Sequence, residues 1–259
     1  MQRQGNYPPP KPRSYDIPGL EFAGTIEALG ADVRDWQLSD HVLGLLADGG
    51  HATQVTVHER MLVRVPPALS LTEAAIVPEA FLTAYDALAD KAALQAGDTV
   101  LVHAAGSGVG TAAIQLARAM GATQVLATSR SEWKRQQSLA LGVDRAIDPE
   151  RESLARAVGE ATGDRGADII LDFLGGEMLA ANVQAAALAG HIVQIAHLGG
   201  RSATLDIRTL MDKRLQLRGT TLRSRPPEAK MALTQQFAAR WCPSWPMAAC
   251  ARCWIAALG

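Results

Sequence analysis

The chain has 259 residues, 48% hydrophobic and 20% charged, which is enough to bury the core of one large or two ordinary domains. Its 25 Lys and Arg residues balance 26 Asp and Glu residues, so a net charge of -1 excludes a general attraction to nucleic acid or anionic membranes. No apolar run reaches the roughly 18 residues of a membrane span, and residues 1–16 lack the apolar segment of a signal peptide. We therefore expect a cytoplasmic globular protein with no nucleic-acid or membrane partner.

The cysteines lie in one place. All three, Cys242, Cys250 and Cys253, fall within the last 18 residues. A disulfide framework is not confined to one tail, and this spacing has neither a fourth cysteine nor a nearby histidine to complete a zinc site. A body without cysteine is typical of a reducing compartment. We predict no metal site.

The first third of the chain combines β and helical patterns. Residues 1–18 contain five prolines and predict an extended lead-in. Residues 19–65 carry short apolar alternations separated by glycine-rich turns, which predict β-structure. Residues 70–93 predict a helix that has Ser70 and Thr72 as candidate N-caps and is interrupted at Pro78.

From residue 97 onward, strands and helices alternate. The predicted strands are 98–104, 123–129, 145–147, 167–173, 191–196 and 215–221, and the predicted helices are 109–120, 132–141, 152–161 and 178–188. Continuously apolar strands separated by helices are typical of a parallel sheet covered on both faces. Six such strands predict an α/β fold of the doubly wound, dinucleotide-binding kind.

A glycine-rich loop connects the first of these strands to its helix. The loop reads Gly106, Ser107, Gly108, Val109 and Gly110. Glycines let the backbone approach a pyrophosphate, and the helix N-terminus offers free N–H groups to that anion. The alternative is a glycine-rich turn without a ligand.

The end of the second strand indicates which nicotinamide dinucleotide would bind. An NAD site usually has an acidic residue there, about 20 residues after the glycines. Residues 127–131 contain no acid, whereas Arg130, Ser131 and Lys134 form a basic, hydroxyl-bearing cluster suited to a 2'-phosphate. We predict NADPH as the cofactor. The alternative is a solvated helix start in which Ser131 is only an N-cap.

Several long stretches carry a family resemblance: MQRQGNYPPP, IPGLEFAGTIEALG, IVPEAFLTAYDAL, GDTVLVHAAGSGVGTAAIQLA, DIILDFLGG and TTLRSRP. From Met1 to about Arg240 the chain resembles zinc-independent NAD(P)H quinone oxidoreductases of the medium-chain dehydrogenase/reductase superfamily, of the p53-inducible type. The resemblance implies a partial β-rich GroES-like catalytic domain at 1–77 and a Rossmann NADP-binding domain at 78–240. Residues 241–259 form an aberrant tail.

The resemblance also implies a function and its residues. The function is zinc-independent hydride transfer from NADPH to a quinone-type acceptor. Tyr7 would line the substrate side of the nicotinamide as the catalytic residue, and Thr83 would lie near the nicotinamide. The remaining cofactor contacts would come from His197, Leu198, Gly199, Leu222 and Arg223.

Structural alternatives apply to four of these side chains. Tyr7 can be a surface aromatic, and Thr83 can be a helix hydroxyl that bonds to its own backbone. His197 can be a polar residue at a strand end. His103, late in a buried strand, is interpreted as a core histidine whose hydrogen bonds are satisfied.

Zinc-dependent relatives carry a Gly-His-Glu segment where this chain reads Gly19-Leu20-Glu21. A catalytic zinc needs about three protein ligands, so Glu21 alone cannot form such a site.

The alternative functions are an enoyl or alkenal double-bond reductase of the same superfamily, with an enone substrate, and a catalytically inactive cofactor-binding fragment. The resemblance further implies a homodimer, with residues 215–220 as a candidate edge.

Both ends depart from the family pattern. Family members have more β-structure before the MQRQG segment, so the chain is interpreted as truncated there. The tail after Arg240 contains all three cysteines and three of the five tryptophans. We interpret it, as a hypothesis, as a segment read out of frame.

Overall fold

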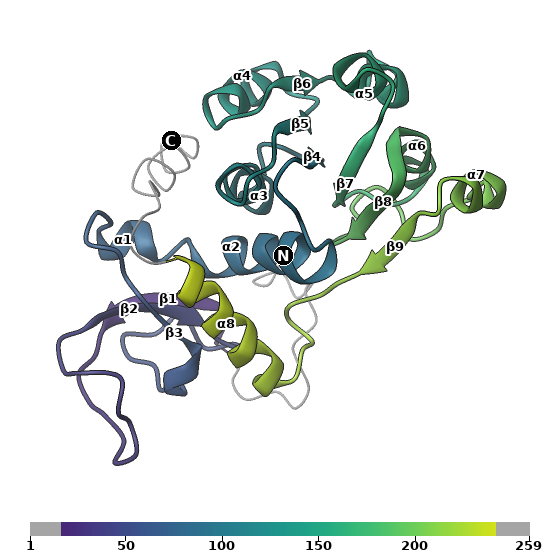
Figure 1. The fold of residues 1–259 in the computed structure, drawn as a ribbon. Coiled ribbons are helices and arrows are strands. Elements are labelled where there is room, and N and C mark those ends of the chain that lie inside the picture. The colour runs from purple at the N-terminus through teal and green to yellow at the C-terminus, as the bar shows by residue number, and fades with distance from the viewer. Residues whose placement is uncertain (1–16, 242–259) are drawn as a thin grey trace. The chain divides into compact units, whose positions relative to one another are not determined.

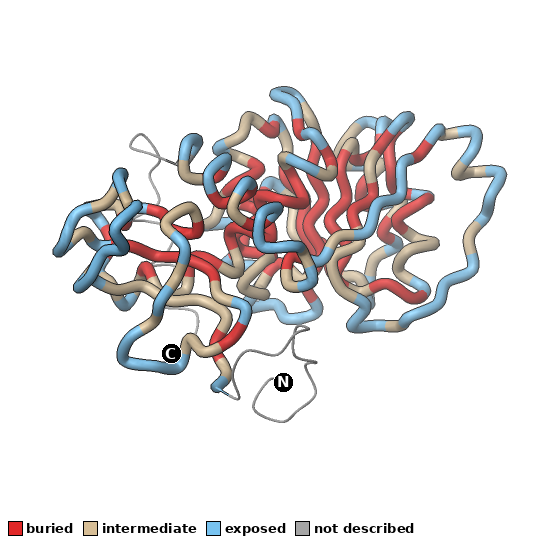
Figure 2. The backbone as a smooth tube through the Cα atoms, turned by 90° about the horizontal axis from the view of Figure 1, so that it is seen from below, coloured by how far each residue is buried: buried red, intermediate tan, exposed pale blue. Residues whose placement is uncertain are grey.

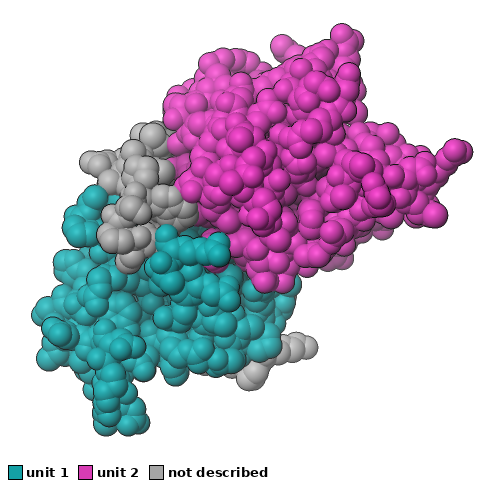
Figure 3. Space-filling view, viewed as in Figure 1, with its two compact units in different colours: residues 1–82, 221–259 teal, residues 83–220 magenta. Residues whose placement is uncertain are grey.

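The structure, a computed structural model, describes residues 17–241 and divides the chain into two compact units. Residues 83–220 form unit 2, and the described part of unit 1 comprises residues 17–82 and 221–241 (Figure 3). The predictions for Tyr7 and for residues 242–259 lie outside the described residues.

Unit 2 contains a six-stranded parallel sheet with the strand order β6-β5-β4-β7-β8-β9 (Figure 1). This order is the one typical of the doubly wound dinucleotide-binding fold. All six strands match predicted ones. Their bounds are β4 Thr99–Val102, β5 Gln124–Thr128, β6 Arg145–Ile147, β7 Ala167–Asp172, β8 Ala186–Gln194 and β9 Gln216–Gly219.

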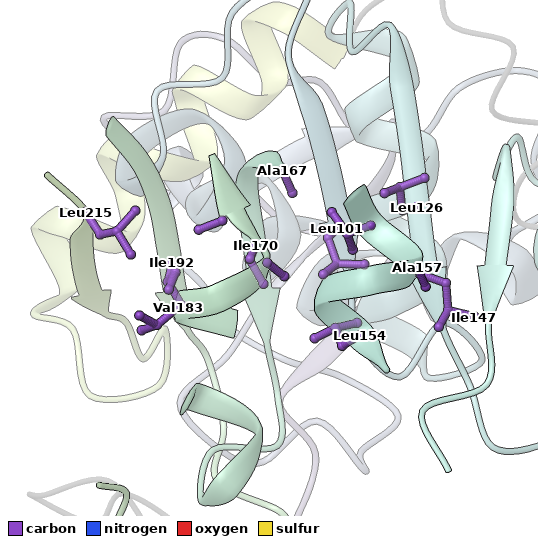
Figure 4. Close-up of a cluster of buried hydrophobic side chains, with 13 residues drawn as sticks. Leu101, Leu126, Ile147, Leu154, Ala157, Ala167, Ile170, Val183, Ile192 and Leu215 are labelled. Atoms are coloured by element: carbon purple, nitrogen blue, oxygen red, sulfur yellow. The ribbon is translucent and has the colours of Figure 1, made fainter. Parts of the chain in front are cut away.

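Helices cover both faces of this sheet. Helices α3 (Gly108–Ala119) and α4 (Glu132–Ala140) contact β4, β5 and β6, while α5 (Leu154–Thr162) and α6 (Glu177–Ala185) contact β6, β7 and β8 (Figure 1). Figure 4 shows the apolar cluster of the α5 and α6 face, to which the strands contribute Leu101, Leu126, Ile147, Ile170 and Ile192. The central strands are buried on both faces of the sheet (Figure 2). Their sequences are therefore continuous apolar runs.

Strand β8 and helix α7 differ from the sequence prediction. The helix predicted over 178–188 ends at Ala185, and β8 begins at Ala186. Ala186 pairs with Ala167, and the register then shifts so that His191 pairs with Ile169. The alanine-rich stretch favours a helix locally, but pairing with β7 decides its structure. Helix α7 (Ile207–Asp212) was not predicted, although Asp206 caps it.

Unit 1 contains a three-stranded antiparallel sheet of β1 (Glu21–Thr25), β2 (His41–Leu45) and β3 (Leu62–Arg64), with β2 in the centre. Turn η2 (Glu59–Met61) precedes β3. Gly44 in β2 is enclosed, because a Cβ there would lie 2.6 Å from the carbonyl oxygen of Met61.

The predicted helix after residue 70 consists of separate segments. Helix α1 (Leu71–Ala74) begins with a capping box: the Ser70 hydroxyl accepts from the Glu73 N–H, and the Glu73 carboxylate accepts from the Ser70 N–H. Helix α2 (Pro78–Tyr85) begins at the interrupting proline, and the π-helical turn η3 (Asp86–Lys91) follows.

Helix α8 (Pro227–Trp241) belongs to unit 1, although the predicted domain boundary at residue 240 assigns it to the dinucleotide-binding domain. The Gln235 side chain donates to the Arg60 carbonyl at 2.8 Å, and Arg60 pairs with Glu228 at 2.7 Å. These contacts join residues that lie far apart in the sequence, so local sequence patterns do not predict them. Among residues 17–241, no helix is long and apolar enough to cross a membrane.

Candidate dinucleotide-binding site

A cavity of about 940 Å³ opens in unit 2 at the carboxyl ends of the parallel strands. Loops that follow five strands line it: Ala104 after β4, residues 129–131 after β5, Pro149 and Glu150 after β6, residues 174–176 after β7, and residues 198–200 after β8. Open α/β sheets bind their ligands at this edge. The topology therefore brings together loops that are up to about a hundred residues apart in the sequence.

The glycine-rich loop forms one wall of the cavity. Ser107 is the N-cap of α3, and its hydroxyl accepts from the Gly110 N–H at 3.0 Å. Gly108 and Val109 lie in the first turn, where no protein acceptor among the described residues engages their N–H groups. These two donors and the positive end of the helix dipole suit a phosphate. A Cβ on Gly110 would lie 2.4 Å from the Ala104 carbonyl oxygen, so glycine permits close packing of helix and strand.

The predicted 2'-phosphate cluster lines the same cavity. Arg130, Ser131 and Lys134 all contribute to the lining, and each is exposed. A Cβ on Gly106 would lie 2.4 Å from Lys134 Cδ, so the aliphatic stem of Lys134 crosses directly over this glycine. The glycine loop and the basic cluster are thus one packed unit.

Ser131 is also the N-cap of α4, as the structural alternative proposed. Its hydroxyl oxygen accepts from the Lys134 N–H at 3.5 Å. The hydroxyl hydrogen remains available for donation, so capping and anion binding are compatible. On the cavity rim, Arg130 pairs loosely with Glu150 at 3.9 Å, and both side chains are largely exposed.

Arg135, which was not predicted from the sequence, holds the backbone of this cluster. Its side chain is nearly buried, donates to the Ser129 carbonyl at 2.6 Å and pairs with Asp148 at 3.0 Å. A second nitrogen pairs with Glu132. Because its charge is matched by two carboxylates, Arg135 fixes the loop after β5 and offers little charge to a ligand. A buried arginine in a polar helix leaves no distinct sequence signal.

The opposite wall consists of two glycine-rich loops. The Gly199 N–H donates to the Leu174 carbonyl at 2.7 Å, and Gly175 forms a bridge with Gly200. Predicted residues Leu198 and Gly199 line the cavity, whereas His197 is exposed beside it and is not part of the lining. Glu177 and Ser202 also line this wall and were not predicted; their position after a parallel strand was the available signal.

Six other predicted cofactor residues lie outside the cavity lining: Gly108, Val109 and Gly110 in the first turn of α3, and Thr83, Leu222 and Arg223 elsewhere. Thr83 is buried in α2, while Leu222 and Arg223 belong to unit 1. Leu222 is buried there, and the Arg223 carbonyl accepts from the Lys230 ammonium at 2.9 Å. Their roles toward a cofactor remain predictions.

Unit 1 contains a pair of half-buried acids, Glu21 and Glu79. The Glu21 carboxylate accepts from the Glu79 N–H at 2.8 Å, and burial raises the pKa of Glu21 to about 7. Burial also raises the pKa of Glu79, opposed by the nearby charges of Lys230 and Arg223. Across residues 17–241, no group of three or more His, Cys, Asp or Glu side chains lies together in a way that could hold a metal ion.

Two family models match the chain. The model described as zinc-binding dehydrogenase matches residues 108–238, and the alcohol dehydrogenase GroES-like domain matches residues 1–67. The first covers about half of the chain and includes helix α3 from Gly108 onward and the cavity-lining loops after β5, β6, β7 and β8. The protein therefore belongs to the medium-chain dehydrogenase/reductase superfamily, a family of NAD(P)-dependent oxidoreductases.

Individual relatives include a quinone oxidoreductase-like protein and a synthase. The chain is 33% identical over 202 residues to quinone oxidoreductase-like protein 2 of Bos taurus, and 41% identical over 214 residues to erythronolide synthase EryA2 of Saccharopolyspora erythraea. These alignments cover 78% and 79% of the chain. They cover 58% of the bovine protein and 6% of the synthase, so the chain spans less than two thirds of either relative.

Solved structures show the same fold. An alcohol dehydrogenase superfamily protein from Novosphingobium aromaticivorans matches with a TM-score of 0.74 at 33% identity, covering 87% of this chain and 67% of that one. The CurK enoyl reductase matches with a TM-score of 0.73 at 29% identity, covering 93% and 76%. The expectation of an oxidoreductase of the medium-chain dehydrogenase/reductase superfamily is confirmed. The p53-inducible type remains a prediction.

Proposed function

We propose that the protein is an NADPH-dependent oxidoreductase that transfers a hydride to a quinone-type acceptor without zinc. The observation that carries the proposal is the cavity in which the glycine loop and the Ser131 and Lys134 cluster are packed together. The 33% identity to a quinone oxidoreductase-like protein supports the acceptor class.

The residues present fit a dinucleotide phosphate. Gly108 and Val109, which directly follow the lining residues Gly106 and Ser107, offer N–H groups to the pyrophosphate. The lining residues Ser131 and Lys134 offer a hydroxyl and an ammonium to the 2'-phosphate. No acid follows β5 at residues 129–131, where a ribose diol would need one. When bound, the cofactor supplies the hydride, and the protein supplies orientation and a site that excludes water.

A zinc ion is not required by this proposal. Leu20 stands where zinc-dependent relatives have a histidine, and the neighbouring Glu21 accepts a backbone N–H instead of facing a set of further ligands. Catalytic zinc usually has three protein ligands. Reduction of a quinone by direct hydride transfer does not depend on such an ion.

The second candidate is an enoyl or alkenal double-bond reductase with an enone or unsaturated thioester substrate. The identity of 41% to a polyketide synthase and the structural match to the CurK enoyl reductase favour it. Both candidates use the same cofactor cavity and differ in the acceptor.

The two candidates are separated by the acceptor that oxidises NADPH. The 259-residue chain is mixed with NADPH and either a naphthoquinone or a crotonyl thioester, and the absorbance of NADPH is followed in single-turnover conditions. The primary proposal expects rapid oxidation with the quinone and little with the thioester. The opposite ranking would favour the double-bond reductase. Binding of NADPH without oxidation by either would indicate an inactive cofactor-binding fragment.

We also propose that the protein pairs into a homodimer through β9, the edge strand of the parallel sheet. All four residues of β9 are exposed, including the apolar Leu217. An open edge with apolar side chains is a template for pairing with a second copy. Replacing Leu217 by lysine is expected to shift the protein from dimer to monomer in sedimentation experiments, whereas an unchanged mass would contradict the pairing.

A further inference from the structure

Four buried polar side chains form a chain that joins the two walls of the dinucleotide cavity. They are Thr128 at the end of β5, His103 directly after β4, Asn182 in α6 and Asp172 at the end of β7. Each is at most 1% exposed. Of the four, only His103 was predicted from the sequence, as a core histidine whose hydrogen bonds are satisfied, and its bonds to Thr128 and Asn182 confirm this.

The hydrogen bonds of this chain run in one direction. The Asn182 amide donates to Asp172 Oδ2 at 2.9 Å, so its oxygen faces His103 Nε2 at 2.7 Å. An amide oxygen can only accept, and therefore Nε2 carries the hydrogen. Burial lowers the pKa of His103 and keeps the ring neutral, so Nδ1 accepts from the Thr128 hydroxyl at 2.9 Å.

Both ends of the chain reach residues that line the cavity. Thr128 itself lines it, and the Thr128 carbonyl accepts from the Ala105 N–H at 2.9 Å, directly before the glycine loop. At the other end, Asp172 Oδ1 accepts from the N–H groups of Leu174 at 2.6 Å and Gly175 at 3.0 Å. The polar chain thus connects the phosphate-loop wall to the turn at residues 174–176.

The backbone conformation of the turn at residues 174–176 depends on hydrogen bonds from residues outside the turn. Gly175 and Gly176 both have positive φ, +63° and +55°. Glycine has more backbone freedom than any other residue, so two in succession do not define one conformation by themselves. The two bonds to Asp172 select this conformation, and Asn182 and His103 in turn orient the Asp172 carboxylate. A buried polar network of this kind specifies geometry more than it adds stability.

We propose that His103 and Asn182 are positioning residues of the dinucleotide cavity, which hold the turn at residues 174–176 in register with the phosphate-loop wall. The inference rests on the proposed function, because it assumes that the cavity binds the dinucleotide. It goes further by assigning a binding role to side chains that cannot touch the ligand.

The test uses substitutions that keep the shape of the core. Thr128→Val removes the hydroxyl that donates to His103, while Thr128→Ser retains it. Asn182→Leu removes both central bonds at similar volume. Thr99→Val is the matched control: Thr99 is 1% exposed at the opposite end of β4, and its hydroxyl accepts from Arg165 at 2.6 Å. For each variant, the Kd for NADPH is titrated by fluorescence, and thermal unfolding of the free protein is recorded.

We expect Thr128→Val to raise the Kd for NADPH about five- to tenfold, because a turn that is no longer held in place must be ordered when the dinucleotide binds. Thr128→Ser and Thr99→Val should stay within about twofold of the parent, although Thr99→Val lowers the unfolding temperature to a similar degree as Thr128→Val. In the quinone assay, the KM for NADPH should rise in Thr128→Val while kcat stays within about twofold.

A purely structural role would give a different result. If Thr128→Val and Thr99→Val bind NADPH equally well, the positioning role is refuted. Asn182→Leu is expected to weaken binding at least as much as Thr128→Val, and if it fails to fold, Thr128→Val decides the question. If the parent chain binds neither NADPH nor NADH, the proposed function itself fails, which distinguishes the two failures.

Discussion

Replacing Gly106 by alanine tests whether the glycine loop and Lys134 act together. The φ angle of Gly106 is not in the left-handed region, so alanine fits the backbone there. The added Cβ would lie 2.4 Å from Lys134 Cδ, 2.7 Å from Cγ and 3.0 Å from Cβ. Since these atoms belong to the stem of the lysine and not to its flexible end, the whole side chain must leave its present path.

The size of the effect follows from the contact that Lys134 would lose. A hydrogen bond to a charged group contributes roughly 1.5–3 kcal/mol. Lys134 is exposed, and solvent screening reduces this to about 1–2 kcal/mol. We therefore expect Gly106→Ala and Lys134→Ala each to weaken NADPH binding about 5- to 30-fold. NADH, which lacks the 2'-phosphate, should lose little in Lys134→Ala.

Fluorescence titration of four proteins with NADPH and with NADH measures these changes in affinity. The proteins are the parent, Gly106→Ala, Lys134→Ala and the double variant. If alanine acts through Lys134, the double variant binds NADPH about as well as Lys134→Ala alone, which corresponds to a coupling of about 1–2 kcal/mol. Arg156→Ala is the control, because it removes one exposed positive charge from helix α5.

Two results would refute the reasoning. Equal affinities of the parent for NADPH and NADH would mean that the basic cluster does not bind a 2'-phosphate. If Gly106→Ala weakens both dinucleotides equally, and by the same factor in the Lys134→Ala background, the added methyl group acts on the pyrophosphate alone.

Three further predictions concern other parts of the molecule. The pKa of Glu21 lies near 7 instead of near 4.5, so the folded chain binds an extra proton between these pH values and loses about 3 kcal/mol of stability as the pH rises through them. Glu21→Gln should flatten this decline in denaturant titrations from pH 5 to 8, whereas the exposed control Glu27→Gln should leave the decline unchanged. Gly175→Ala should lower the unfolding temperature more than Gly163→Ala does: both glycines have φ near +60°, but only a Cβ at residue 175 meets a carbonyl oxygen, that of Gly200 at 2.7 Å. Equal effects would show that the φ angle alone determines the loss of stability. Metal analysis should find no stoichiometric zinc, and quinone reduction should survive chelation; a zinc ion whose removal abolishes reduction would contradict the proposal.

The hypothesis of an out-of-frame tail concerns Trp241, the last residue of α8, and residues 242–259, which lie outside the described residues; resequencing of the locus around codon 241 is its direct test.

The sequence by itself determined the elements and their class. Continuous apolar strands alternating with helices predicted all six strands of the parallel sheet, and Ser70 and Pro78 marked a helix start and an interruption. The glycine loop was found because its function requires glycine at a strand-to-helix junction. Such signals are local: periodicity, capping and turn residues act within a few positions of the chain.

Tertiary structure alone decided what depends on distant partners. Strand β8 begins at Ala186 because pairing with β7 outweighs the helix preference of an alanine-rich stretch, and α8 joins unit 1 through contacts with Arg60. The path of Lys134 over Gly106 and the polar chain through His103 likewise join residues tens of positions apart. No local pattern encodes these contacts, because packing and hydrogen-bond satisfaction are settled only when the sheet brings its carboxyl ends together.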